Sequence, residues 1–91
     1  MSEIQSIEEK LKLLEGWIHN REKNCLEKEY HFKSYLKNIS FVNAVAFIAN
    51  KENHHPDLEV SFSKCIVRIT THDQNGITQK DFELAQKINE L

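Results

Sequence analysis

Three histidines lie close to residues that commonly end helices and strands. His54 and His55 are adjacent and precede Pro56, and His72 follows an alternating apolar segment. An imidazole group exchanges protons readily near neutral pH, because its unperturbed pKa is about 6.5. Together with Asp81, these side chains could provide general acid–base catalysis or, alternatively, ligands for zinc or iron.

Each of these residues also has a structural interpretation. Adjacent histidines at the end of a helix can cap its carbonyl groups and interact with its dipole, and His72 can be a surface residue at a strand end. Asp81 follows Thr78 by three residues, an arrangement close to a capping box. However, Asp81 shares a predicted helix face with Leu84 and Ile88, and a buried carboxylate there needs a partner such as histidine.

The hydrophobic pattern predicts the elements that would hold these residues in place. Apolar residues at helical spacing predict a first helix from residue 4 to near Gly16, and alternation predicts strands over 17–19 and 26–32. A long helix over 34–53, strands over 58–63 and 65–72, and a last helix after Thr78 complete the chain. The order α-β-β-α-β-β-α predicts a single α+β domain over 1–91, with a four-stranded antiparallel sheet and three helices on one face.

The same periodicity predicts the core. The helix over 34–53 is the most apolar segment, so we expect it to be the central core helix, packed through Leu36, Phe41, Val42, Val45, Ile48 and Ala49. Alternation also groups strand residues by face. Each of these sets is expected to share one face: Leu26, Lys28, Tyr30 and Phe32; Leu58, Val60 and Phe62, the apolar side of a half-buried strand; and Cys65, Val67, Ile69 and Thr71. The last helix is expected to bury Leu84, Ala85, Ile88 and Leu91.

Charge and composition exclude several functions. The 91 residues include 12 Lys and Arg against 14 Asp and Glu, and the two signs are interspersed. Binding to phosphate backbones requires clustered basic side chains, so we do not expect direct contact with DNA or RNA. No apolar run reaches the length of a membrane span, and the N-terminus does not resemble a signal peptide.

The cysteines, Cys25 and Cys65, lie far apart in the sequence, which favours neither a zinc pair nor a disulfide framework. We interpret them as buried thiols of a protein in the reducing cytoplasm. A chain of this length builds only a modest core. Because the predicted sheet also has uncovered edges, we expect the protein to self-associate.

The candidate residues together resemble the signature of the pterin-4a-carbinolamine dehydratase family. That signature has a His-His-Pro group, an aromatic residue soon after it, a third histidine after the next strand, and an aspartate in the first turn of the last helix. The matching segments here are Asn53-His54-His55-Pro56-Asp57, Phe62, Thr71-His72-Asp73, Gly76-Ile77-Thr78 and Asp81. Trp17 and the series Phe32, Phe41 and Phe47 also resemble the family, so the resemblance covers nearly the whole chain.

The resemblance implies a cofactor-free enzyme that removes water from 4a-hydroxytetrahydropterin, giving quinonoid dihydropterin in tetrahydrobiopterin recycling. It implies that His54 and His72 are the acid–base pair and that His55 binds and orients the pterin. Asp81 would hold one histidine in a useful tautomer and favour its charged form. The residues expected to contact substrate are His54, His55, Pro56, Asp57, Thr71 and His72. The family also implies a homodimer or homotetramer.

Two positions depart from the family pattern, and two other functions compete with catalysis. Asn50 stands where the family often has an acidic residue, and Leu58 stands where many members have tryptophan. A metal site is one competing function, although adjacent histidines such as His54 and His55 tend to diverge. The other is a non-catalytic binding module, since some family members also act as dimerisation cofactors of a transcription factor.

Overall fold

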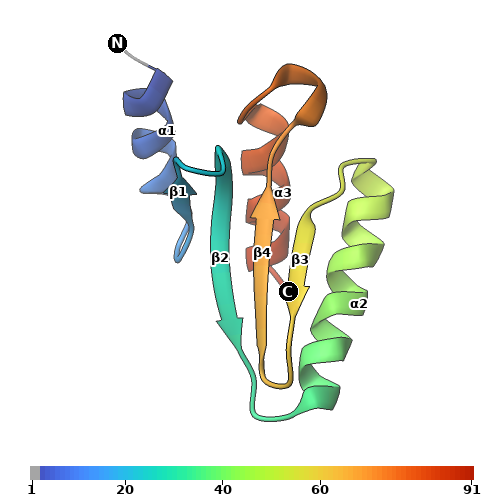
Figure 1. Cartoon of the computed structure of the whole chain (residues 1–91). Helices are drawn as coiled ribbons and strands as arrows, with labels where there is room; N and C mark the ends of the chain where they lie inside the picture. Colours follow the sequence, from blue (N-terminus) through green and yellow to red (C-terminus); the bar gives the residue numbers. More distant parts are fainter. Residues whose placement is uncertain (1–2) are drawn as a thin grey trace.

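The helices and strands follow one another in the predicted order (Figure 1). The structure is a computed structural model that describes residues 3–91. Its elements are α1 (Glu3–Leu11), β1 (Ile18–Asn20), β2 (Cys25–His31), α2 (Tyr35–Glu52), β3 (Asp57–Val60), β4 (Lys64–Ile69), the short 3-10 helix η1 (His72–Gln74) and α3 (Gln79–Asn89). The predicted order α-β-β-α-β-β-α is therefore confirmed, with η1 inserted before the last helix.

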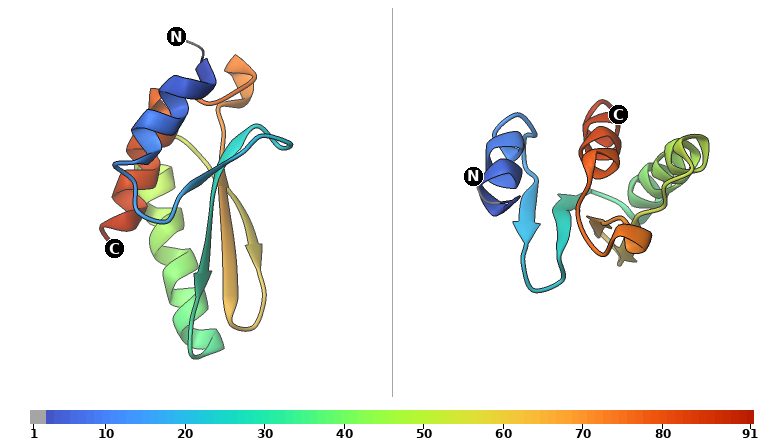
Figure 2. Two further views of the ribbon diagram at one scale, coloured as in Figure 1. Left: turned by 90° about the vertical axis from the view of Figure 1, so that its left-hand side faces the viewer. Right: turned by 90° about the horizontal axis from the view of Figure 1, so that it is seen from above.

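The strands form one four-stranded antiparallel sheet in the order β1-β2-β4-β3. The three α-helices cover one face of this sheet, and α3 lies between α1 and α2 (Figure 2). The register pairs Asp57, the first residue of β3, with Arg68 near the end of β4. The α2–β3 junction and the end of β4 therefore lie at the same end of the sheet, and these are the two segments that carry the candidate histidines.

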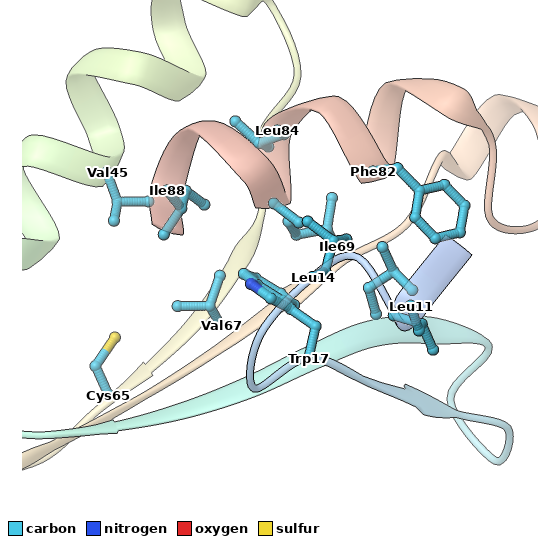
Figure 3. Close-up of a cluster of buried hydrophobic side chains, with 12 residues drawn as sticks. Leu11, Leu14, Trp17, Val45, Cys65, Val67, Ile69, Phe82, Leu84 and Ile88 are labelled. Atoms are coloured by element: carbon cyan, nitrogen blue, oxygen red, sulfur yellow. The ribbon is translucent and has the colours of Figure 1, made fainter. Parts of the chain in front are cut away.

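The core lies between the sheet and α3 (Figure 3). Val67 and Ile69 on β4 are buried, and so are Leu84 and Ile88 on α3. These residues face one another because alternate strand residues share a face, as do helix residues at three- and four-residue spacing. Burial of each such side chain stabilises the fold by about 1.5–3 kcal/mol. The cluster is completed by Leu11, Leu14, Trp17, Leu26, Val45, Cys65, Phe82 and Ala85.

Two predictions about the helices are wrong. The central helix is α3 rather than α2, which lies at one side of the helix layer (Figure 2) and leaves Leu36 75% and Phe47 71% exposed. The first helix ends at Leu11 instead of near Gly16, and the chain turns before β1. Gly16 has a φ of 85°, a left-handed conformation that glycine adopts without strain, and it lies in the turn that leads into β1.

Three apolar strand or helix residues that we expected in the core lie on the surface, namely Val60, which is 41% exposed at the end of β3, and then Phe62 and Leu91. Phe62 is 70% exposed in the turn after β3, where its ring stacks on that of Tyr35 with centroids 6.2 Å apart. Leu91 follows the end of α3 and is 57% exposed. Phe62 and Leu91 each continue the hydrophobic pattern of an element beyond the point where the element itself ends. None of the described helices is both long and apolar enough to span a membrane.

Candidate active site

The end of α2 sets the position of His54. The cap residue Asn53 adopts a left-handed conformation with a φ of 53°, which asparagine tolerates better than most residues. The His54 backbone N–H then donates to the Ala49 carbonyl at 3.1 Å, which closes the last turn of the helix. Pro56 disfavours further helix at the preceding residue, so the chain continues into β3.

The end of β4 sets the position of His72. Thr71 and Gly76 exchange backbone hydrogen bonds, at 2.9 Å from the Thr71 N–H and 3.3 Å from the Gly76 N–H. This pairing closes a short loop, in which Asn75 takes a left-handed conformation with a φ of 53°. We predicted that His72 closes the fourth strand, but β4 ends at Ile69 and His72 begins η1. The backbone hydrogen bonds between Thr71 and Gly76 therefore fix both ends of the loop that carries His72.

Asp81 in the first turn of α3 joins these two segments. Its side chain is fully buried, with 0% exposure. One carboxylate oxygen, Oδ1, lies 2.5 Å from Nε2 of His54. The other, Oδ2, accepts hydrogen bonds from the Thr71 hydroxyl at 2.9 Å and from the Thr78 backbone N–H at 2.7 Å. The carboxylate thus links the end of α2, the end of β4 and the start of α3.

Asp81 makes both of the contacts that the sequence presented as alternatives. The bond from the Thr78 N–H is a helix-capping interaction, and it also complements the partial positive charge at the start of α3. The contact with His54 is the histidine partnership predicted from the inward face. One buried carboxylate has both roles because its two oxygens point to different partners.

The predicted site residues differ in their accessibility. The His54 side chain is 13% exposed and turns inward to Asp81, whereas His55 and His72 are exposed. Adjacent His54 and His55 thus have different environments, which is the divergence expected of neighbouring histidines. Among the predicted substrate contacts, Asp57 is exposed, Pro56 is half-buried, and Thr71 is buried with its hydroxyl bonded to Asp81.

The arrangement can support proton transfer. His54 has a fixed carboxylate partner and a small exposed surface, which suits an acid–base group. Across residues 3–91, no group of three histidine, cysteine, aspartate or glutamate side chains is arranged to hold a metal ion. Cys25 and Cys65 are free and buried, and burial raises the pKa of both thiols. Buried thiols with a raised pKa are poor nucleophiles.

Sequence reasoning missed the contact of the Thr71 hydroxyl with Asp81 and the contact between the hydroxyls of Thr71 and Thr78. Thr71 was expected to contact substrate, and Thr78 was expected only as a cap; their hydroxyl oxygens lie 2.7 Å apart beside the carboxylate. A signal was available for Thr71, because it continues the inward parity of Cys65, Val67 and Ile69. A hydroxyl at a buried position normally indicates a hydrogen-bond partner nearby.

Solved structures share this fold. A protein from Brucella melitensis described as a transcriptional coactivator/pterin dehydratase superposes with a TM-score of 0.90 at 28% identity, covering 99% of this chain and 95% of its own. A second structure, described as a pterin dehydratase-like RuBisCO assembly factor of the alpha-carboxysome, superposes with a TM-score of 0.70 at 16% identity. It covers 82% of this chain and 87% of its own, and at that identity the likeness shows the fold alone.

Relatives are found in bacteria and archaea. A protein of Paracidovorax citrulli is 48% identical over 80 residues, covering 86% of this chain and 69% of its own. One from Sulfolobus acidocaldarius is 40% identical over 85 residues, covering 93% and 91%. Both carry the name "Putative pterin-4-alpha-carbinolamine dehydratase". The sequence model of the family described as pterin 4 alpha carbinolamine dehydratase matches residues 2–91, and the chain, with its buried aspartate–histidine pair, is a member of that family.

Proposed function

We propose that the protein is a 4a-hydroxytetrahydrobiopterin dehydratase. In this elimination the bond between ring carbon 4a and its hydroxyl oxygen breaks, and the neighbouring ring nitrogen loses its hydrogen as a proton. A carbon–nitrogen double bond forms, and the products are quinonoid dihydropterin and water. A reductase can return that product to tetrahydropterin, so the reaction would support tetrahydrobiopterin recycling.

The observation that carries this proposal is the contact of His54 with the buried Asp81, 2.5 Å apart. The elimination needs one group to give a proton to the leaving hydroxyl and one to take a proton from nitrogen. No hydride moves and no covalent intermediate is required, so positioned imidazoles are sufficient. A buried carboxylate that fixes one imidazole supplies the required orientation.

The site residues have distinct proposed roles. His54 and His72 share proton transfer, His55 binds and orients the pterin, and Asp81 positions His54. Pro56 and Asp57 lie at the start of β3, beside the end of β4, where they could line one side of the bound ring. Thr71 acts through its contact with Asp81, and any contact with substrate would be secondary because its side chain is buried.

The decisive experiment is a stopped-flow assay with chemically generated 4a-hydroxytetrahydropterin. The protein should accelerate its dehydration after exhaustive treatment with a chelator, because histidine side chains would move both protons. A rate equal to that of buffer alone would refute the dehydratase proposal. Activity that disappears with chelator and returns with zinc would replace histidine acid–base catalysis with metal catalysis.

A non-catalytic binding role is the second candidate. It is favoured by the relative with a TM-score of 0.70 whose description is that of an assembly factor, which indicates that this fold can serve assembly. The same assay separates the two candidates. A binding module should retain pterin affinity or a protein partner while failing to accelerate dehydration.

We also propose that the chain forms a homodimer or homotetramer in the cytoplasm. The edge strands β1 and β3 end the sheet, and α2 exposes Leu36 and Phe47 on its outer side. Free thiols at Cys25 and Cys65 suit a reducing compartment. Light scattering at micromolar concentration should give a mass well above the 10.7 kDa monomer, and a monomer alone would contradict the proposal.

A further inference from the structure

The two oxygens of Asp81 are bonded to different kinds of partner. Oδ2 accepts from the backbone N–H of Thr78, which can only donate, and from the hydroxyl of Thr71. Oδ1 is left for Nε2 of His54 at 2.5 Å. An ionised carboxylate accepts hydrogen bonds and donates none, so Nε2 of His54 must carry the hydrogen in this contact.

From this geometry we infer which atom of His54 exchanges protons and which residue fixes it. Neutral His54 is the tautomer with hydrogen on Nε2, and its Nδ1 is the atom that takes or gives a proton. Thr71 is the positioning residue that holds the Asp81 carboxylate in the required rotation. The inference rests on the proposed dehydratase function. The sequence could assign proton transfer only to His54 as a whole, whereas the geometry assigns it to the Nδ1 atom of that residue.

The threonine hydroxyls extend the argument, since each has a single hydrogen. Thr71 gives its hydrogen to Asp81 Oδ2, so the 2.7 Å contact between the hydroxyls must use the hydrogen of Thr78. The chain of donors therefore runs in one direction, from Thr78 to Thr71 to Asp81. His54 donates to the other oxygen of the same carboxylate, so the threonine hydroxyls and the imidazole all direct their hydrogens toward Asp81.

The chemical step follows from that direction. As a base, His54 takes the proton of the pterin nitrogen onto Nδ1 and becomes an imidazolium, while its Nε2–H stays bonded to Asp81. If His54 is instead the acid of the pair, its imidazolium gives the Nδ1 proton to the leaving hydroxyl, which departs as water, while His72 takes the proton of the ring nitrogen. Asp81 exchanges no proton in either direction, and its fixed negative charge stabilises the imidazolium that forms.

Nitrogen-15 NMR of labelled protein tests the assignment without reference to activity. At a pH where His54 is neutral, its spectrum should show hydrogen on Nε2 and a bare Nδ1. Thr71→Val keeps the shape of the side chain but removes the hydroxyl, so it should give a mixture of tautomers and lower turnover by about tenfold, as when other histidine-orienting partners are removed. Thr71→Ser, which keeps the hydroxyl, should restore both.

Thr70→Val is the matched control. The Thr70 hydroxyl donates to the Asn24 carbonyl at 3.0 Å and has no contact with Asp81, so tautomer and turnover should stay as in the wild type. Hydrogen on Nδ1 in the wild-type spectrum would overturn the inference even if Thr71→Val did not fold. So would an unchanged tautomer in folded Thr71→Val. An Nε2–H tautomer in a protein without dehydratase activity would refute the proposed function but support the assigned hydrogen.

Discussion

The two ends of α3 each hold a polar side chain on which several donors converge. At the first turn this residue is Asp81, which contacts His54 and two threonines. At the last turn it is Asn89, whose Oδ1 accepts from Trp17 Nε1 at 2.9 Å, Lys28 Nζ at 2.8 Å and the Tyr30 hydroxyl at 3.2 Å. The same helix thus carries two hydrogen-bond centres of similar construction.

The two centres differ in the chemistry of their donors and acceptors. At the Asn89 centre, burial, followed by the neighbouring Cys65, raises the pKa of Tyr30 to about 12, so its hydroxyl remains a donor at ordinary pH. The acceptor there is a neutral amide that does not titrate. At the Asp81 centre a carboxylate faces an imidazole, a side chain that can both give and take a proton. The Asp81 centre is suited to proton exchange, and the Asn89 centre is suited to holding Trp17, β2 and α3 together.

Loss of the histidines should have the largest effect. His54→Ala and His72→Ala should each lower turnover by about 10²–10⁴-fold, the usual contribution of a general acid or base. The double variant should approach the uncatalysed rate, because no proposed proton-transfer group remains. Stopped-flow dehydration measures both, and circular dichroism checks that each variant is folded. A double variant with near wild-type turnover would remove both residues from the mechanism.

Removing only the charge of Asp81 should have the next largest effect. Asp81→Asn can still accept from the Thr78 N–H, so the cap is largely kept and the stability cost should stay below about 2 kcal/mol. The variant no longer holds His54 by charge, and turnover should fall by about 10–100-fold. A melting curve and a turnover measurement on one preparation separate these effects. A lower melting temperature with unchanged turnover would leave Asp81 as a helix cap only.

The sequence predicted the order of the helices and strands better than it predicted which side chains contact one another. Alternation placed Val67 and Ile69 in the core correctly, because a strand has only two faces and one of them is covered by helices. Periodicity misjudged α2, where Leu36 was expected to widen the core face but is 75% exposed. A helix that is apolar over much of its surface does not reveal from its own sequence which side its neighbours will cover.

The same limit applies to the site. The spacing from Leu84 and Ile88 predicted correctly that Asp81 faces inward, and burial predicted a polar partner. Which of the three histidines is that partner depends on how α2 and α3 pack, since His54 and Asp81 lie 27 residues apart. Asn89 gave no signal at all, because an amide at the end of a helix is typical of exposed surface.

The Asn89 centre should affect stability without affecting chemistry. Asn89→Ala leaves the buried Trp17 N–H without its acceptor and also removes one acceptor from Lys28 and Tyr30, which should cost about 1–3 kcal/mol. For a domain of this size, each 1 kcal/mol lowers the melting temperature by about 4–8 °C. Turnover per folded molecule should be unchanged. A loss of turnover comparable to that of Asp81→Asn would break the distinction between the two ends of α3.

The smallest effect should come from Glu27, a carboxylate that is paired with the permanently charged Arg68. Glu27 lies on the sheet face opposite the helices, where Arg68 Nε donates to it at 2.6 Å and Asn20 at 3.0 Å. Burial alone would raise the pKa of Glu27, but these hydrogen bonds and the guanidinium charge outweigh it and hold the pKa below its ordinary value. The folded-state pKa is thus lower than the unfolded one. The stabilising contribution of Glu27 is therefore complete above the unfolded-state pKa and is lost as the pH falls through the folded-state pKa.

The variant Glu27→Gln measures this contribution to stability, which we expect to be independent of the chemistry at the Asp81 centre. At neutral pH the variant should be less stable by about 0.5–1 kcal/mol, the value of a partly exposed ion pair. The difference from wild type should shrink on acidification, because both proteins then lack the charge, and turnover should not change at any pH. Urea denaturation at neutral and acidic pH follows the stability, with Glu59→Gln as the control, since Glu59 contacts the same Arg68 at 2.6 Å but is 64% exposed. A difference that grows on acidification would mean that the ionised Glu27 destabilises the fold, contrary to the sign of its pKa shift.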